Sequence, residues 1–408
     1  MRNILYISRA GLPISAAGLR TFNIGTILEN LGFDVHYLAN RRITNKELDS
    51  TYEKLDSKDN TFLDNSEHHF RIDNKVYSYL PKQKKGKIAS IKEILELVSS
   101  KKAYKRVVSY CEKEKPYAVF LYNESYALTK KLIAYCKKNS IKLFSDVTEW
   151  YEMDKNKNFA EKFVVRSTEK RITKLDHTLD GIIAISNYFE DFYKSKDANV
   201  VRIPPLMEID KGLEISKHEY YDGKSVLNFV YAGSPGGKDI LIPFVQALQF
   251  VNKDGIKARL DVVGIDEKYF DRFDVVDKNL KETGVVAHGR LSHEETLGVV
   301  KRADFGILFR HNKRYAKAGF STKLAECMSV GVPMICNSIG GCDLCINNFE
   351  NGVLTDTADV EELKNILGNL LRMSVDDVVE MKKKAYSYAF NTFSVEKYEA
   401  VIKKMMGC

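Results

Sequence analysis

Short apolar runs alternate with helical stretches along most of the chain, and this alternation restricts the possible folds more than any other feature. The runs are rich in Val, Ile, Leu and Phe, which is typical of strands buried on both faces of a parallel sheet. We expect strands at residues 4–7, 33–38, 117–122, 141–146, 179–185, 200–205, 227–233, 258–263, 285–290, 303–308, 334–336 and 353–354. The pattern predicts an α/β protein with two doubly wound, Rossmann-like domains that face a central cleft.

A polar and charged segment divides the chain into two parts. Pro204-Pro205 stiffens the end of the first part, and residues 208–224 have the composition of a linker. The sequence therefore predicts an N-terminal domain at 1–205, a linker at 206–224 and a C-terminal domain at 225–393. Residues 40–80 are polar and poorly periodic, so no regular element is expected there.

Composition excludes several classes of protein. The 408 residues are 44% hydrophobic, enough for two cores, yet no run is long and apolar enough to span a membrane, and the chain starts directly with a strand pattern. Seven scattered cysteines fit a reducing, cytoplasmic location, and the lone C-x-x-C pair of Cys342 and Cys345 predicts no metal site. The net charge of +8 is too diffuse for a dedicated nucleic-acid binder.

A glycine-rich loop follows the strand at 227–233. It contains Gly233, Gly236, Gly237 and Lys238. Glycines free a backbone to wrap around an anion, and a lysine ammonium can bind a phosphate oxygen. A β-turn with a surface lysine is the alternative explanation.

The segment 309–341 combines a basic loop, a short helix, a strand and a Gly-Gly turn. Ser321 or Thr322 is expected to cap the helix, whose N-terminal N–H groups favour an anion. Glu326 lies four residues after Thr322, where its carboxylate suits the two hydroxyls of a ribose. A surface glutamate that stabilises the helix dipole is the alternative.

Two groups of residues stand out in the N-terminal half. A long loop of small residues is expected at 8–21, before a helix at 22–31. In this loop Gly18 would permit the close approach of an acceptor or a diphosphate, and Arg20 could either reach a phosphate or remain solvated. Asp146 and Glu149 follow a strand at its carboxyl end, where α/β proteins bind ligands. Capping of the next helix by Asp146 is an equal alternative.

Residues 82–106 form a basic stretch with a helical apolar stripe. Nine lysines and arginines face only two glutamates there. Such a stretch can lie on the anionic face of a membrane, or it can be a core-packing helix with a solvated basic side.

The segment that contains Phe320, Glu326 and Gly331-Val332-Pro333 resembles the donor-site signature of family 4 retaining glycosyltransferases. The S-T-K-L-x-E form is similar to the branch found in bacterial surface-polysaccharide clusters. The resemblance implies the GT-B fold, a final helix at 394–408 that packs back on the first domain, and transfer from a nucleotide-diphosphate sugar. Three positions depart from the pattern: Ala318 replaces the first of two glutamates, Ser321 stands where glycine is usual, and Ser234 stands where arginine is usual.

The resemblance also implies roles for individual residues. The chemistry would be carried by Lys238, Glu326, Asp146 and Glu149, without a metal or other cofactor. Donor binding would involve Gly233, Gly236, Gly237, His288, Arg290, Arg310, Gly319, Phe320, Ser321, Thr322 and Lys323. The acceptor would be a glycan or a polyprenyl-linked glycan, and the enzyme would work at the inner face of the plasma membrane, with residues 82–106 as the membrane contact.

Two rival hypotheses remain open. A GT-B nucleotide-sugar epimerase uses the same architecture but needs acid and base groups in both domains. A degenerate transferase acting as a scaffold is suggested by Ala318 and Ser234. A dehydrogenase is disfavoured because the loop at 8–21 lacks the G-x-G-x-x-G fingerprint.

Overall fold

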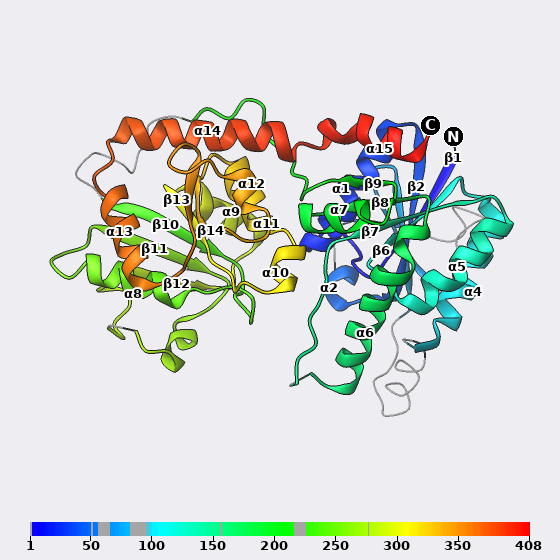
Figure 1. Ribbon diagram of the computed structural model, residues 1–408, viewed down its shortest axis with the longest axis horizontal. Coiled ribbons are helices and arrows are strands. Elements are labelled where there is room, and N and C mark those ends of the chain that lie inside the picture. Colours follow the sequence, from blue (N-terminus) through cyan, green and yellow to red (C-terminus); the bar gives the residue numbers. More distant parts are fainter. Residues whose placement is uncertain are drawn as a thin grey trace. The chain divides into compact units, whose positions relative to one another are not determined.

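The computed structural model divides into two compact units, Met1–Leu206 with Val395–Cys408, and Met207–Ser394 (Figure 1). Both units are α/β with largely parallel sheets, which confirms the predicted fold class. The structure describes residues 2–49, 52–55, 66–81, 96, 98–155, 157–215, 226–275 and 277–408.

Nine strands of the described residues form the sheet of the N-terminal unit, in the order β3-β4-β5-β2-β1-β6-β7-β8-β9. The pairs from β5 to β9 are parallel, whereas β3 and β4 add an antiparallel edge. That edge lies in residues 40–80, where the sequence pattern predicts no element. The strands are β1 (Arg2–Ser8), β2 (Phe33–Arg42), β3 (Glu53–Leu55), β4 (His68–Ile72), β5 (Lys75–Leu80), β6 (Ala118–Tyr122), β7 (Lys142–Val147), β8 (Gly181–Ala184) and β9 (Val200–Arg202).

The first helix begins earlier than the sequence suggests. Ser15 caps α1 by accepting a hydrogen bond from the Gly18 N–H, so Gly18 and Arg20 lie in the helix and not in a loop. A Cβ on Gly18 would lie 2.1 Å from the Leu12 carbonyl oxygen, so this glycine lets the preceding loop pack against the helix. The helices of this unit include α1 (Ala16–Asn30), α2 (Asn45–Leu48), α4 (Lys101–Glu114), α5 (Tyr126–Lys138), α6 (Phe159–Lys174), η1 (Asp176–Thr178), α7 (Asn187–Lys194), η3 (Val395–Tyr398) and α15 (Glu399–Met406).

Alternating residues of β1 build two cores, one on each face of this sheet. Ile4 and Tyr6 pack with α1 and with Ile402 of α15, which places the C-terminal helix in the core of the N-terminal unit. Leu5 and Ile7 pack on the other face with α4 and α5. The period of two is that of a strand buried on both sides.

The sheet of the C-terminal unit is entirely parallel, in the order β12-β11-β10-β13-β14-β15. The chain moves outward from β10 to β12 and then returns to the other side of β10 with β13. The topological switch point therefore lies between β10 and β13, where sheets of this kind bind ligands. The strands are β10 (Leu227–Ala232), β11 (Ala258–Val263), β12 (Val285–Gly289), β13 (Phe305–Leu308), β14 (Met334–Asn337) and β15 (Gly352–Thr355).

Helices cover both faces of this second sheet. The helices α8 and α13 contact each other, and their buried residues Phe244 and Leu367 share a core with Phe229 of β10. The helices α11 and α14 also contact each other, and they contribute Leu324 and Ala389 to a second core. The helices of the unit include α8 (Ile242–Val251), η2 (Glu267–Arg272), α9 (His293–Lys301), α10 (Arg314–Ala318), α11 (Thr322–Ser329), α12 (Cys342–Cys345), α13 (Val360–Leu370) and α14 (Val375–Phe393).

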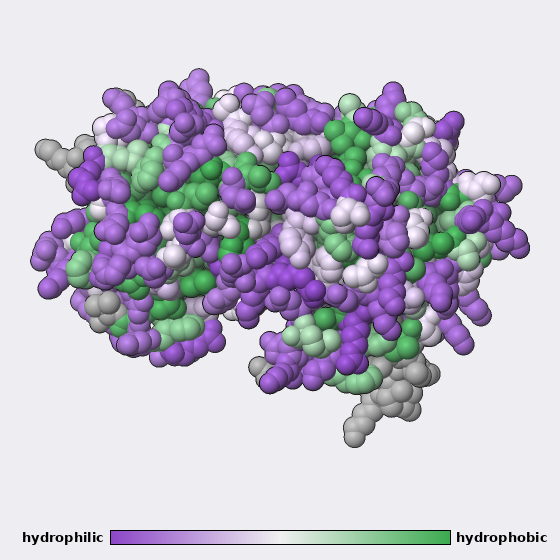
Figure 2. All heavy atoms as spheres, in the orientation of Figure 1, coloured by the Kyte–Doolittle hydropathy of each residue, from purple (hydrophilic) through white to green (hydrophobic). Residues whose placement is uncertain are grey.

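Hydrophilic residues cover much of the face shown in Figure 2, with apolar residues scattered among them. Among the helices that the structure describes, none combines the length and the hydropathy that crossing a membrane requires.

Candidate functional site

Two loops meet at the switch point of the C-terminal sheet. The loop after β10 and the residues after β13 are joined by a backbone bridge between Asp239 and Arg310. The Ile240 N–H donates to the Phe309 carbonyl oxygen at 2.7 Å. The glycine-rich loop that contains Lys238 is therefore anchored directly at the edge where a ligand is expected.

Asp239 is the centre of a buried charged cluster at this edge. Its carboxylate accepts hydrogen bonds from Lys323 Nζ at 2.6 Å, from Arg310 Nε at 3.0 Å and from the Tyr231 hydroxyl at 2.7 Å, and the side chain is 2% exposed. Burial alone would raise the pKa of Asp239, but Lys323 and Arg310 outweigh it and hold the pKa below its ordinary value. The carboxylate is thus ionised and fixes two cations in place.

Close backbone packing explains the glycines beside this cluster. A Cβ on Gly233 would lie 2.7 Å from Lys323 Cε, and a Cβ on Gly264 would lie 2.7 Å from the backbone of Gly233. The Gly237 carbonyl oxygen accepts a hydrogen bond from the Tyr315 hydroxyl at 3.1 Å. Lys238 itself is exposed, one residue before the buried Asp239. The loop is therefore held at several points while its lysine faces solvent.

The N-terminus of α11 lies beside the same cluster, because Lys323 is its second residue. Ser321 occupies the N-cap position, but its side chain makes no capping hydrogen bond, contrary to expectation. Its Oγ is buried and lacks a hydrogen-bond partner among the described residues. Buried hydroxyls are normally satisfied, so this atom, together with the free N–H groups of the first turn, fits a bound polar ligand.

Glu326 is half-buried on α11, one turn after Thr322. Burial raises the pKa of its carboxyl, and nearby His293, Lys323 and the Thr322 hydroxyl offset part of that effect. The structure places Glu326 on the helix that carries Lys323, three residues away. It therefore belongs to the same edge of the unit as the Asp239 cluster.

Several other residues of the segment 309–341 take part in packing. The ring of Phe320 lies against Gly341, where an added Cβ would approach the ring to 2.9 Å. The Asn337 side chain accepts a hydrogen bond from the Arg310 N–H at 2.9 Å and donates one to the Arg310 carbonyl oxygen at 2.8 Å. Gly319 is the C-cap of α10, a short helix in the part of the segment expected to be a loop, and Ala318 is fully buried. Cys342 and Cys345 are buried free thiols.

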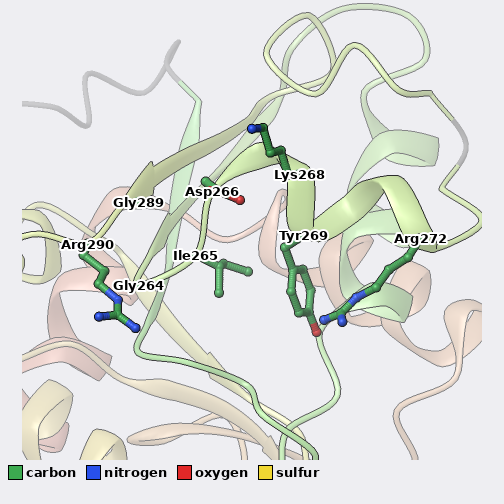
Figure 3. Close-up of a pocket in the computed structure, with 8 residues that line it drawn as sticks. All are labelled: Gly264, Ile265, Asp266, Lys268, Tyr269, Arg272, Gly289 and Arg290. Atoms are coloured by element: carbon green, nitrogen blue, oxygen red, sulfur yellow. The ribbon is translucent and has the colours of Figure 1, made fainter.

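A cavity of about 470 Å³ lies at the carboxyl ends of β11 and β12 (Figure 3). Its lining comprises Gly264, Ile265, Asp266, Lys268, Tyr269, Arg272, Gly289 and Arg290. Arg290, a predicted donor-binding residue, lines it. His288, another predicted donor-binding residue, does not line it; its Nε2 lies 2.5 Å from Asp261 Oδ1 on the neighbouring strand.

The structure corrects the roles expected for Arg20 and Asp146. They form a buried ion pair at 2.7 Å, with side chains 4% and 0% exposed. Arg20 also donates to the carbonyls of Ile203 and Pro204, and Asp146 accepts from the Tyr6 hydroxyl. Both groups are therefore engaged inside the N-terminal unit, and neither a phosphate contact by Arg20 nor helix capping or an acceptor contact by Asp146 fits this geometry.

The structure describes Glu149 and the later part of the basic stretch 82–106. Glu149 is half-buried beside Trp150, whose indole N–H donates to Glu169. Residues 82–95 lie outside the described residues. The later part of the stretch is α4, which packs Ala103 and other apolar residues in the core, and Arg106 there is paired with Glu67. This part is a core-packing helix.

Sequence reasoning missed Asp239 and Tyr231. The signal available was a carboxylate directly after the lysine of a glycine-rich loop, at the end of a strand. Its meaning depends on Lys323, which is 84 residues away in the chain. Only the fold brings these groups together.

Comparison with known proteins gives a family match for much of the C-terminal unit. Residues 238–391, which begin at Lys238 and include all of α11, match the family model described as "Glycosyl transferases group 1". The uncharacterized glycosyltransferase MJ1069 of Methanocaldococcus jannaschii is 22% identical over 246 residues, or 56% of this chain and 59% of that protein. The match thus spans about three fifths of the length of this relative. Over part of its length the chain is thus similar to a glycosyltransferase family and to one protein of that class, in line with the resemblance seen in the sequence.

Solved structures resemble the whole chain. Sucrose-phosphate synthase from Thermosynechococcus elongatus has a TM-score of 0.66 at 14% identity and covers 99% of this chain and 98% of its own. HepE of Anabaena, solved with UDP-glucose, has a TM-score of 0.62 at 14% identity over all of both chains. WaaG, a glycosyltransferase involved in lipopolysaccharide biosynthesis, has a TM-score of 0.65 at 12% identity over 99% of this chain and 100% of its own. The likeness confirms the GT-B fold.

Proposed function

We propose that this protein is a retaining glycosyltransferase that transfers a sugar from a nucleotide-diphosphate donor. The single observation that carries the proposal is the Asp239 cluster, which fixes Lys323 and Arg310 at the switch point beside exposed Lys238. A diphosphate leaving an anomeric carbon gains negative charge. Fixed cations and helix N–H groups stabilise such charge without a reorganisation cost during the reaction.

The donor would lie along the carboxyl edge of the C-terminal sheet. Lys238 and the first turn of α11 would bind the diphosphate, with the Ser321 hydroxyl, which has no partner in the described part of the chain, as a further donor. Glu326 would accept hydrogen bonds from the ribose hydroxyls, and the cavity beside Arg290 would hold the base. The structure of HepE, a protein of the same fold, was solved with UDP-glucose, which supports a nucleotide sugar as the ligand of this edge.

We propose that the reaction needs no metal ion, because protein cations neutralise the diphosphate. Lys238, Lys323 and Arg310 carry three positive charges near one loop, and with the Asp239 carboxylate counted a net charge of +2 remains there for a diphosphate. Arg310 and Lys323 would replace the arginine that is absent at Ser234. Loss of one such donor typically lowers the rate on the order of 100-fold.

For the acceptor we propose a glycan or polyprenyl-linked glycan of a bacterial surface polysaccharide. The resemblance of residues 320–333 to that branch of family 4 supports the proposal, as does the fold shared with WaaG. Glu149, exposed in part after β7, remains the candidate for an acceptor contact. Residues 82–95 would supply the contact with the inner face of the plasma membrane.

The experiment that tests this function begins with a thermal-shift screen of UDP-, GDP-, ADP- and CDP-sugars on the full chain. The best donor is then incubated with extracted lipid-linked glycans, and the product linkage is read by NMR. We expect transfer with the anomeric configuration of the donor. An epimerised sugar formed without acceptor would identify an epimerase, and a protein stabilised by none of the donors would be a scaffold.

Variants connect the activity to the site. Lys238→Ala and Glu326→Ala are each expected to lower transfer on the order of 100-fold with the melting temperature unchanged. Near-wild-type turnover in both variants would contradict the assignment.

A further inference from the structure

The helix α6 of the N-terminal unit has a basic and aromatic outer face. Its inner side is fixed by buried Val165 and Ile172 and by the Ser167 hydroxyl, which accepts a hydrogen bond from the Tyr126 N–H at 3.0 Å. Side chains spaced three and four residues apart share one face of a helix. The outer face defined in this way contains two phenylalanines, four cations and no acidic residue, namely Phe159, Lys162, Phe163, Arg166, Lys170 and Lys174.

Large apolar side chains are exposed where this outer face begins. The Phe159 side chain is 74% exposed, which is the highest value among the large hydrophobic residues that the structure describes. Met153, in the turn before the helix, is 48% exposed. Figure 1 shows α6 and the turn before it at an outer edge of the N-terminal unit. These two side chains contribute little to the core, and they would gain free energy by entering an apolar partner.

Positive charge surrounds the exposed apolar side chains. Residues 153–174 carry seven lysines and arginines against three carboxylates. The two carboxylates of α6 are engaged away from the outer face, since Glu161 accepts a hydrogen bond from the Asn158 N–H at 2.8 Å and Glu169 accepts one from the Trp150 indole. The outer face is therefore complementary to a surface that combines negative charge with an apolar interior.

We propose that the outer face of α6, together with Met153, docks on an anionic lipid bilayer. Phe159 and Met153 enter the boundary between headgroups and acyl chains, while the cations of the face contact lipid phosphates. The backbone of a nucleic acid would also attract these cations, but it would leave the two apolar side chains in water. This inference rests on the proposed function, to which it adds a membrane contact distinct from residues 82–95.

Co-sedimentation of the full chain with lipid vesicles tests the proposal. The protein pellets with vesicles of equal parts phosphatidylcholine and phosphatidylglycerol, and it stays in the supernatant with phosphatidylcholine alone. The double variant Met153→Ser/Phe159→Ser lowers the partition coefficient at least about tenfold, because the apolar contribution is lost. Arg166→Gln/Lys170→Gln lowers it on the order of tenfold as well, because two cations no longer attract the anionic surface. Added salt weakens the binding of the wild type.

Fluorescence gives a second readout at the tip of the helix. Trp150 is the only tryptophan of the chain, and it is buried. Phe159→Trp therefore adds one exposed indole, whose emission shifts to shorter wavelength when anionic vesicles are added. An unchanged spectrum would show that this position stays in water and would overturn the proposal.

Matched controls come from the C-terminal unit. Phe250→Ser removes a phenylalanine that is 54% exposed, and Lys383→Gln/Lys384→Gln removes two exposed lysines of α14. Both controls pellet like the wild type. If the α6 variants also pelleted like the wild type, or if the wild type ignored anionic vesicles, the proposal would be wrong. Donor binding stays unchanged in every variant, whereas a wild type that binds no nucleotide sugar would reject the proposed function whatever the vesicles show.

Discussion

Lys323 Nζ lies 2.6 Å from Asp239 Oδ2, although 84 residues separate the two in the chain. This contact joins the glycine-rich loop after β10 to the first turn of α11. Arg310 binds the other carboxylate oxygen of Asp239 at 3.0 Å. One buried carboxylate therefore sets the positions of two cations at the edge where the donor diphosphate is proposed to bind.

Asp239→Asn is expected to destabilise the protein by about 3 kcal/mol at pH 7, because it leaves Lys323 and Arg310 without their counter-charge. Donor affinity is expected to fall as well, since the cations lose their fixed positions. Urea unfolding and donor titration measure the two effects. Tyr231→Phe removes only one neutral donor and is expected to cost about 1 kcal/mol. Equal unfolding midpoints for wild type and Asp239→Asn would refute the role given to this cluster.

The same pair predicts a pH dependence. The pKa of Asp239 is lower in the folded protein than its ordinary value, because Lys323 and Arg310 outweigh the effect of burial. Its stabilisation is therefore complete above the unfolded pKa of about 4 and is lost as the pH falls through the folded pKa. The difference in unfolding free energy between wild type and Asp239→Asn is expected to shrink as the pH falls below about 4.

The variant Arg20→Met tests whether Arg20 acts as the buried partner of Asp146 or as a phosphate-binding residue. A buried Asp146 without its partner is expected to destabilise the protein by about 3–5 kcal/mol. The double variant Arg20→Met/Asp146→Leu should recover much of this loss, because no unpaired charge remains. Chemical denaturation of the three proteins checks the prediction. If Arg20→Met instead left stability unchanged and raised KM, the result would support the phosphate contact that the sequence suggested.

His36 predicts a loss of stability in mild acid. Burial, His69 and Arg106 lower the pKa of His36 to about 3, while its unfolded value is near 6.5. Between these two pKa values His36 is protonated in the unfolded chain but not in the folded protein. The free energy of unfolding therefore falls as the pH drops from about 6.5 to about 3. The expected slope from this group is about 1.4 kcal/mol per pH unit. His36→Gln should show a correspondingly shallower decline in urea unfolding; an identical slope would exclude His36 as its source.

Much of the fold follows from the sequence because buried parallel strands have a strong local signal. β1, β6, β7, β10 and β11 lie where their apolar runs predict them. The strands β3, β4 and β5 were missed because they are short and mix polar residues with the aromatic residues Phe70, Tyr77 and Tyr79, which only the fold brings into the core.

The site was harder to predict because its meaning lies in contacts between distant residues. Small residues made the start of α1 resemble a loop, whereas Ser15 caps the helix and Gly18 packs against Leu12. Arg20 and Asp146 looked accessible after their strands, but they neutralise each other in the core. Motifs thus indicated the edge of the C-terminal sheet that contains the switch point, while burial and pairing decide which side chains remain available there.

The central claim is that the edge containing Lys238 binds the diphosphate of the donor. Calorimetric titration with the best-bound nucleotide diphosphate tests it most directly, using wild type, Lys238→Ala and Lys253→Ala. Lys253 is an exposed lysine after α8, in the turn that leads to the amino end of β11. The account predicts that Lys238→Ala weakens binding at least about tenfold, the loss expected for a charge-assisted contact, and that Lys253→Ala binds like the wild type. Wild-type affinity in Lys238→Ala would contradict it.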